Sequence, residues 1–158
     1  MNVKTSKLKV LLWSIAFPGF GQLLNRQLIK GILFITLELL INTYSHFNQV
    51  IMLSFLGEIE EAVQTVEFGW LMFYPCIYMY AMYDAYKNAD GSEPPLSFLP
   101  FAFGAYFVTV GLMYSPKLKL FGVLFGPIWL PMLSLIPGLL TGFLIRFIIL
   151  RIQAFRKR

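Results

Sequence analysis

The stretch LFGVLFGPIWLPMLSLIPGLLTGFLIRFIILRI, which runs from Leu120 to Ile152, decides the fold class of this chain. Its only charges are Arg146 and Arg151 near the end, and it exceeds the about 20 apolar residues that a helix needs to cross a bilayer. Three prolines divide it, and membrane helices tolerate proline where neighbouring groups satisfy the freed carbonyls. We expect an interfacial lead-in over residues 120–125 and a kinked membrane-spanning helix over residues 128–150.

The composition of the whole chain indicates the same class. The 158 residues are 58% hydrophobic and 13% charged, with a mean hydropathy of +0.68, whereas soluble domains are about 45–50% apolar and about 25% charged. The aromatic share of 17% suits side chains at membrane interfaces. The net charge of +5 comes from Lys and Arg beside apolar runs. It therefore indicates topology, and we expect no nucleic-acid partner.

Five more segments complete the expected architecture. The segments 28–44, 69–86 and 98–114 predict further membrane-spanning helices. Segment 46–68 has apolar residues at every fourth position and an acidic face, which is typical of an external amphipathic helix. Segment 10–24 would rise only about 22 Å as a helix, short of the about 30 Å hydrocarbon core, so we expect a re-entrant or interfacial half-helix. Residues 1–158 then form one all-α, polytopic membrane domain with about four transmembrane helices.

The distribution of Lys and Arg selects one topology. If segment 10–24 does not cross, every Lys and Arg except Lys117 and Lys119 lies on one side. If it does cross, every later element is inverted. Lys117 and Lys119 then lie on the same side as Lys4, Lys7 and Lys9, and all other Lys and Arg residues lie on the opposite side. Because cytoplasmic loops are enriched in Lys and Arg, we expect both termini in the cytoplasm and the protein in the cell (plasma) membrane.

The most distinctive motif is FPGFGQLLN over residues 17–25, followed by Lys30-Gly31. Pro18 removes a backbone donor, and Gly19 and Gly21 permit tight turns. Gln22 and Asn25 can satisfy the backbone groups that a turn within a membrane leaves unpaired. The motif therefore predicts a hairpin that dips into the bilayer and returns, and the alternative is a site that lines a solute or ion path.

This motif, together with Tyr83-Asp84-Ala85-Tyr86, resembles an uncharacterised family of small bacterial multi-pass membrane proteins. That family combines a Pro-Gly-x-Gly-Gln-x-x-Asn opening with a later Asp-Ala element. The layout is also similar to the two-transmembrane-helix domain family, in which a glycine-rich turn joins two helices and an Asp ends the second. The resemblance covers about residues 7–89. It implies a bacterial membrane location and a structural hairpin, without a defined activity.

Isolated polar residues within the apolar segments are candidate functional residues. Glu38 is expected near the middle of a span, where a carboxylate is costly and defaults to a functional hypothesis. Asn42 or Arg146 are its possible partners, although Arg146 can instead extend to the headgroups. Asp84 can pair with Lys87 on one helix face, or cap the hairpin turn.

Two glycine motifs predict close helix packing, Gly122-x-x-x-Gly126 and Gly138-x-x-x-Gly142. Packing within the monomer and contact with a partner or second copy are both open. Because the sequence has one Cys and one His, we expect no metal centre and no cofactor.

Three functions remain open. The first is a non-enzymatic accessory or interaction protein with a membrane protein partner or as a homo-oligomer. The second is a small transporter, channel or permease component that uses Glu38 and Asp84. The third is a membrane-embedded enzyme, for which the sequence offers no convincing catalytic set.

Overall fold

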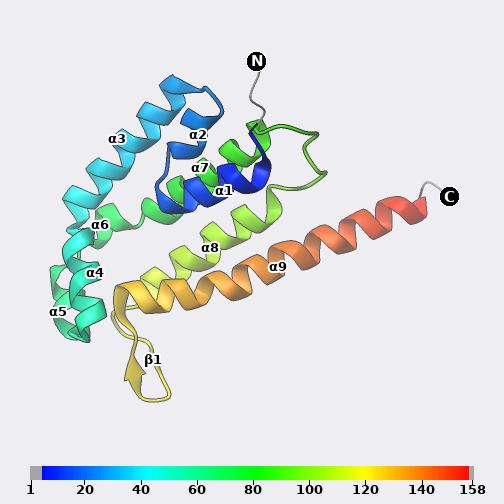
Figure 1. Ribbon diagram of the computed structural model, residues 1–158. Helices are drawn as coiled ribbons and strands as arrows, with labels where there is room; N and C mark the ends of the chain where they lie inside the picture. Colours follow the sequence, from blue (N-terminus) through cyan, green and yellow to red (C-terminus); the bar gives the residue numbers. More distant parts are fainter. Residues whose placement is uncertain (1–4, 157–158) are drawn as a thin grey trace.

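The computed structural model describes residues 5–156, so the predictions that involve Lys4, Lys157 and Arg158 lie outside it. The described chain is mostly helical, which confirms the all-α class (Figure 1). Its elements are α1 (Lys7–Ala16), α2 (Phe20–Leu24), α3 (Leu28–Ser45), α4 (Phe47–Leu56), α5 (Ile59–Thr65), α6 (Phe68–Leu71), α7 (Tyr74–Asn88), α8 (Leu99–Tyr114), β1 (Lys119–Leu120), β2 (Val123–Leu124) and α9 (Gly126–Arg156).

Four helices, α3, α7, α8 and α9, form an open antiparallel layer in that order. At one side α3 runs against α7, where the ring centroids of Phe34 and Tyr80 are 6.1 Å apart. On its other side α7 contacts α8 through aromatic pairs such as Tyr86 and Phe101, whose centroids are 6.1 Å apart. The α8–α9 contact is the most extensive, and α9 is the outer member of the layer.

The two ends of this layer differ in charge. The basic end holds the start of α3, the end of α7 and the later part of α9, with Lys30, Lys87 and Arg146. The acidic end holds α4 and α5, with four glutamates: Glu58, Glu60, Glu61 and Glu67. The short β1–β2 hairpin lies at the acidic end as well (Figure 1). Among the described residues, Lys117 and Lys119 are the basic residues at the acidic end.

The α1–α2 hairpin enters and leaves at the basic end. Helix α1 runs antiparallel to α7, and the carbonyl of Ile15 near the end of α1 accepts a hydrogen bond from the Tyr78 hydroxyl. The chain then reverses at Phe17–Gly19 and returns along α2. The Thr5 hydroxyl donates to the Leu24 carbonyl over 3.2 Å and closes the two arms at their open end. The hairpin therefore reaches partway along α7 and does not run the length of the layer.

Two expected continuous helices are wrong because each contains a break. The expected amphipathic helix 46–68 is a pair, α4 and α5, separated at Gly57, whose φ of +85° ends α4 in the left-handed region that glycine favours. The expected helix 69–86 is divided into α6 and α7 at Met72–Phe73. Pro75 lies in the first turn of α7, where its missing N–H costs no helical hydrogen bond.

The structure of residues 120–156 also differs from the expected one. The lead-in over residues 120–125 contains the β1–β2 hairpin, in which Phe121 and Gly122 both have positive φ. Gly122 therefore has no helix-packing role, and a Cβ there would meet nothing within 4 Å. Helix α9 then runs unbroken from Gly126 to Arg156 through Pro131 and Pro137.

The surface carries the strongest sign of a membrane environment. Within residues 5–156, α3 and α9 are long and apolar enough to cross a membrane, and α4 and α8 are shorter apolar helices. Large apolar side chains are exposed along α9: Met132, Leu133, Ile136, Leu140, Phe143, Leu144, Phe147, Ile148, Ile152 and Phe155. A soluble monomer rarely exposes so continuous an apolar surface.

Close packing of α8 on α9 depends on Gly142. A Cβ added there would lie 2.5 Å from Pro100 Cα and 2.7 Å from the Leu99 carbonyl oxygen. Because backbone cannot yield as a flexible side chain does, we expect Gly142→Ala to lower the free energy of unfolding by about 1–3 kcal/mol. Gly69→Ala is the matched control, since its Cβ would meet nothing within 4 Å. Equal thermal unfolding midpoints for the two variants would contradict this packing.

Candidate functional site

The turn of the α1–α2 hairpin is fitted tightly against α3. Gly19 has a φ of +101°, and a Cβ at this residue would lie 2.6 Å from the carbonyl oxygen of Gly31. A Cβ at Gly31 would in turn overlap the side chain of Leu23. Pro18 beside them is fully buried. Gly31 of the sequence motif, together with Ile35, is therefore the surface on α3 that receives the turn.

Gly21 gives α2 an equally close contact with α7. A Cβ there would lie 2.7 Å from the Cβ of Ala85, and it would overlap the hydroxyl of Ser14. Ala85 is fully buried together with Val10 of α1. The glycine and alanine of the two motif elements thus face each other, which brings the preceding residue, Asp84, against the hairpin.

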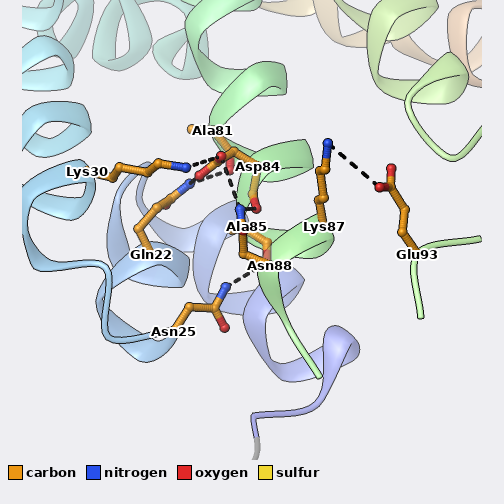
Figure 2. Close-up of polar contacts among 9 residues, drawn as sticks. All are labelled: Gln22, Asn25, Lys30, Ala81, Asp84, Ala85, Lys87, Asn88 and Glu93. Carbon is orange, nitrogen blue, oxygen red and sulfur yellow. Dashed lines mark hydrogen bonds and ion pairs between the residues drawn. The ribbon is translucent and has the colours of Figure 1, made fainter. Parts of the chain in front are cut away.

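Four polar side chains gather around Asp84, and we name these four together with Asp84 the Asp84 cluster (Figure 2). The Lys30 ammonium lies 2.7 Å from Asp84 Oδ1, and the Gln22 amide donates to Oδ2 over 3.2 Å. The Asn88 amide donates to Oδ1, also over 3.2 Å. The members are Gln22, Asn25, Lys30, Asp84 and Asn88. The carboxylate therefore receives hydrogen bonds from α2, from α3 and from its own helix.

The amides of the cluster also satisfy carbonyl groups near the C-terminus of α7. Gln22 Nε2 donates to Ala81 O and Asn25 Nδ2 donates to Ala85 O, both over 2.7 Å. The last carbonyls of a helix lack intrahelical partners, and Ala85 is in this last turn. Gln22 and Asn25 were expected to satisfy the backbone of a membrane turn, but their acceptors lie on α7 and not in the hairpin.

The expected pairing of Asp84 with Lys87 is wrong. Lys87 points away from the cluster and lies 3.8 Å from Glu93 in the loop before α8 (Figure 2). The ion pair that forms instead joins Asp84, whose side chain is 9% exposed, to the half-exposed Lys30. A carboxylate with three donors is balanced in charge and in hydrogen bonds. This arrangement suits a clamp that fixes the hairpin to α3 and α7.

Glu38 belongs to a second and separate polar group. It is buried on α3, and the Tyr74 hydroxyl donates to its Oε1 over 3.2 Å. The expected partners are wrong for a geometric reason. Asn42 lies nearer the acidic end, where it donates to Asn48 over 3.1 Å. Arg146 lies at the basic end, where its Nε donates to the Pro95 carbonyl over 2.9 Å.

The glycines predicted to pack helices divide into two kinds. Gly138 and Gly142 lie on the face of α9 that contacts α8, and a Cβ at Gly138 would lie 2.9 Å from the Phe103 carbonyl oxygen. Gly126 begins α9 with a positive φ and lies against Ile59 of α5. It therefore packs against a side chain and not against a second small residue.

Sequence reasoning missed the partners on α7. Tyr74 and Tyr78 were not among the candidate residues, although their hydroxyls bond Glu38 and the tip of the hairpin. Asn88 was not singled out either. A buried tyrosine normally needs a partner for its hydroxyl, so the tyrosines within a predicted span were the available signal.

The loop before α8 contains a further polar group around Glu93. Its Oε1 accepts from the Tyr83 hydroxyl over 2.8 Å and from the Ser97 hydroxyl over 3.0 Å. These two hydrogen bonds, with Tyr83 the larger effect, lower the pKa of Glu93 below its ordinary value of 4.5. The ionised carboxylate thus joins the loop to α7.

A double-mutant cycle tests the clamp. Because Asp84 is buried and Lys30 is half exposed, we expect Asp84→Asn and Lys30→Met to show a coupling of about 1 kcal/mol in the free energy of unfolding. The matched control is the longer, more exposed Lys87–Glu93 pair, studied with Lys87→Met and Glu93→Gln. Its coupling should be about 0 kcal/mol. Coupling as weak in the first cycle as in the control would refute the clamp.

The lowered pKa of Glu93 predicts an acid-sensitive loop. Its contribution to stability is present above the unfolded pKa and is lost as the pH falls through the lower folded pKa, below about 4.5. Amide hydrogen exchange at Ser97 should therefore accelerate in that range relative to a loop amide elsewhere. Tyr83→Phe should move the change to higher pH, because it removes the largest cause of the lowered pKa. An unchanged midpoint would exclude this coupling.

Comparisons of the chain with protein-family models, with curated proteins and with solved structures give no match. The resemblance of residues 7–89 to a bacterial membrane protein family therefore stays a prediction that rests on the motif residues. The clustering of these residues around Asp84 is a finding about this chain alone.

Proposed function

We propose that this chain is a multi-pass membrane protein in which α3, α7, α8 and α9 cross the bilayer. The exposed apolar side chains of α9 and α3 support this placement, because they match a lipid environment better than water. Because neighbouring helices of the four are antiparallel, each could cross the bilayer in the direction opposite to the one before it. In this arrangement the α1–α2 hairpin is re-entrant, since both of its arms end at the basic end.

The charge difference between the two ends supports a definite orientation. The basic end carries Lys7, Lys9, Arg26, Lys30, Lys87, Arg146, Arg151 and Arg156. By the positive-inside rule this end faces the cytoplasm, and both termini lie there. The glutamates of α4 and α5 then face the opposite side, which the rule permits. The bacterial plasma membrane is proposed from the family resemblance.

Helix α7 is the least apolar of the four proposed spans, and its position explains how it could cross. It lies between α3 and α8, and α1 and α2 cover a further part of its surface. Its polar groups find partners inside the protein, as Tyr74 does with Glu38 and Asp84 does with Lys30. A polar helix is tolerated in a membrane where it is enclosed by other helices in this way.

Within the membrane we propose a non-enzymatic accessory or interaction role. The observation that carries this proposal is the position of α9 at the edge of an open layer. Apart from α4 and α5 at its beginning, α9 is contacted extensively by α8 alone. Large apolar side chains between Met132 and Phe155 are exposed on the rest of α9, so this face is available to a membrane protein partner or to a second copy.

Transport remains the alternative, and the geometry favours it less. A transport path that used both Glu38 and Asp84 would need a continuous route between the two carboxylates. They belong to separate hydrogen-bonded groups in the described chain, and Lys30 and Glu38 lie about 12 Å apart along α3 at 1.5 Å per residue. Asp84 is also fully engaged by its donors, which suits a fixed structural role better than proton exchange.

Thiol labelling tests the topology. Single cysteines at Gln64 and Ser92, both exposed, are introduced into a Cys76→Ser background and labelled in intact cells with a membrane-impermeant reagent. Gln64→Cys should react from outside, and Ser92→Cys should react only after the membrane is opened, because the two lie at opposite ends of the layer. Labelling of both from the same side would contradict the proposed crossings.

Site-specific photocrosslinking tests the interaction role. A photoreactive residue at Leu140, on the free face of α9, should give a discrete protein adduct in cells. The same residue at Leu12 is the matched control, because that side chain is likewise large, apolar and exposed on a helix. A protein adduct specific to Leu140 supports an interface on α9. Lipid adducts alone at both positions would reject it.

A further inference from the structure

A cavity of about 390 Å³ lies between α4, α7, α8 and the beginning of α9. Its volume is within the range of about 300–1,000 Å³ that is typical of small-ligand sites. Its walls are almost wholly apolar, and they include side chains from α4 such as Phe47 and Ile51, from α8 such as Val108, and from α9 such as Leu135. The ligand that fits such a lining is an uncharged, apolar one.

The few polar atoms at the cavity are already engaged elsewhere. Tyr74 and Tyr78 contribute to the wall, but their hydroxyls donate to Glu38 and to the Ile15 carbonyl. A buried water needs two to four polar partners, and apolar cavities without them stay dry. The cavity is therefore suited neither to water nor to an ion, and its chemistry matches a hydrocarbon chain.

The cavity is continuous with the apolar outer surface. Phe55 of α4 and Met132 of α9 belong to its wall, and they are 65% and 56% exposed. Leu71 and Leu112 also line it but are only 2% exposed, so they form its inner part. A ligand can thus enter sideways between α4 and α9, from the environment that covers the outside of α9.

The beginning of α9 fixes the position of this opening. Trp129 donates its indole N–H to the Ser54 carbonyl over 3.0 Å, and its ring lies 4.7 Å from that of Phe55. Tryptophan is enriched at the boundary between hydrocarbon and headgroups. The opening therefore lies at the level where a lipid chain would begin, and the cavity extends from there towards Leu135.

From these observations we infer that the cavity binds one acyl chain of a membrane lipid, inserted between α4 and α9. This inference rests on the proposed membrane placement. The bound chain would fill space that the protein's own side chains leave open, and it would contact α4, α7 and the beginning of α9 together. No covalent step is involved.

Photocrosslinking from the lipid tests this inference. The full-length protein is reconstituted in phosphatidylcholine–phosphatidylglycerol vesicles that contain a phospholipid with a diazirine in mid-chain. After illumination, mass spectrometry maps the adducts. We expect adducts on Leu112 or Leu71, which a lipid outside the protein does not reach, and on Leu39 at the outer surface of α3. Adducts at Leu39 alone would overturn the acyl-chain site and leave the membrane placement intact. Adducts at neither would overturn both.

A variant that fills the cavity provides the second arm. Leu135→Trp should lower the adduct yield at Leu112 by about tenfold, because the larger ring occupies a site that one chain fills. The yield at Leu39 should not change. Leu133→Trp is the matched control, since Leu133 lies on α9 outside the cavity. Val108→Phe fills the cavity from α8 and serves if Leu135→Trp does not fold. An equal loss in the control, or no loss in either filling variant, would overturn the inference.

Discussion

The carboxylate of Asp84 is the group on which the arrangement of the N-terminal half depends. A charge buried against α7 must be compensated, and an isolated one would cost several kcal/mol. Lys30 supplies the opposite charge from α3, and Gln22 supplies an amide from α2. These donors can reach Asp84 together only if the hairpin returns along α7 and α3 begins beside it. One buried acid therefore sets the positions of three helices.

Small residues allow this compensation to occur at close range. Gly21 and Ala85 bring α2 onto α7, and Gly19 brings the turn onto Gly31. A side chain at either glycine would push α2 away and lengthen the hydrogen bonds to Asp84. The glycines and the polar residues of the motif are thus parts of one contact. The same principle acts between α8 and α9, where Gly138 and Gly142 allow backbone to approach backbone.

Local signals in the sequence were sufficient for the helical class, the break at Pro18-Gly19 and the approximate limits of α3 and α8. They were not sufficient for partners, because the pairs Lys30–Asp84 and Tyr74–Glu38 join residues far apart in the chain. The β1–β2 hairpin was missed because its residues are as apolar as a helix, and only the positive φ angles at Phe121 and Gly122 reveal the turn. The break between α4 and α5 was missed because the periodic spacing of apolar residues continues across Gly57. A single residue with a left-handed backbone conformation ends the helix there.

The Asp84 cluster holds residues 5–25 as a hairpin that enters and leaves at the basic end. Spin labels placed one at a time from Ser6 to Arg26 in the reconstituted protein, with power saturation by oxygen and by a water-soluble nickel complex, measure depth at each residue. We expect the depth to increase from Ser6 to the turn near Phe17 and to decrease again to Arg26. A depth that changes in one direction, with Ser6 and Arg26 on opposite sides, would contradict it.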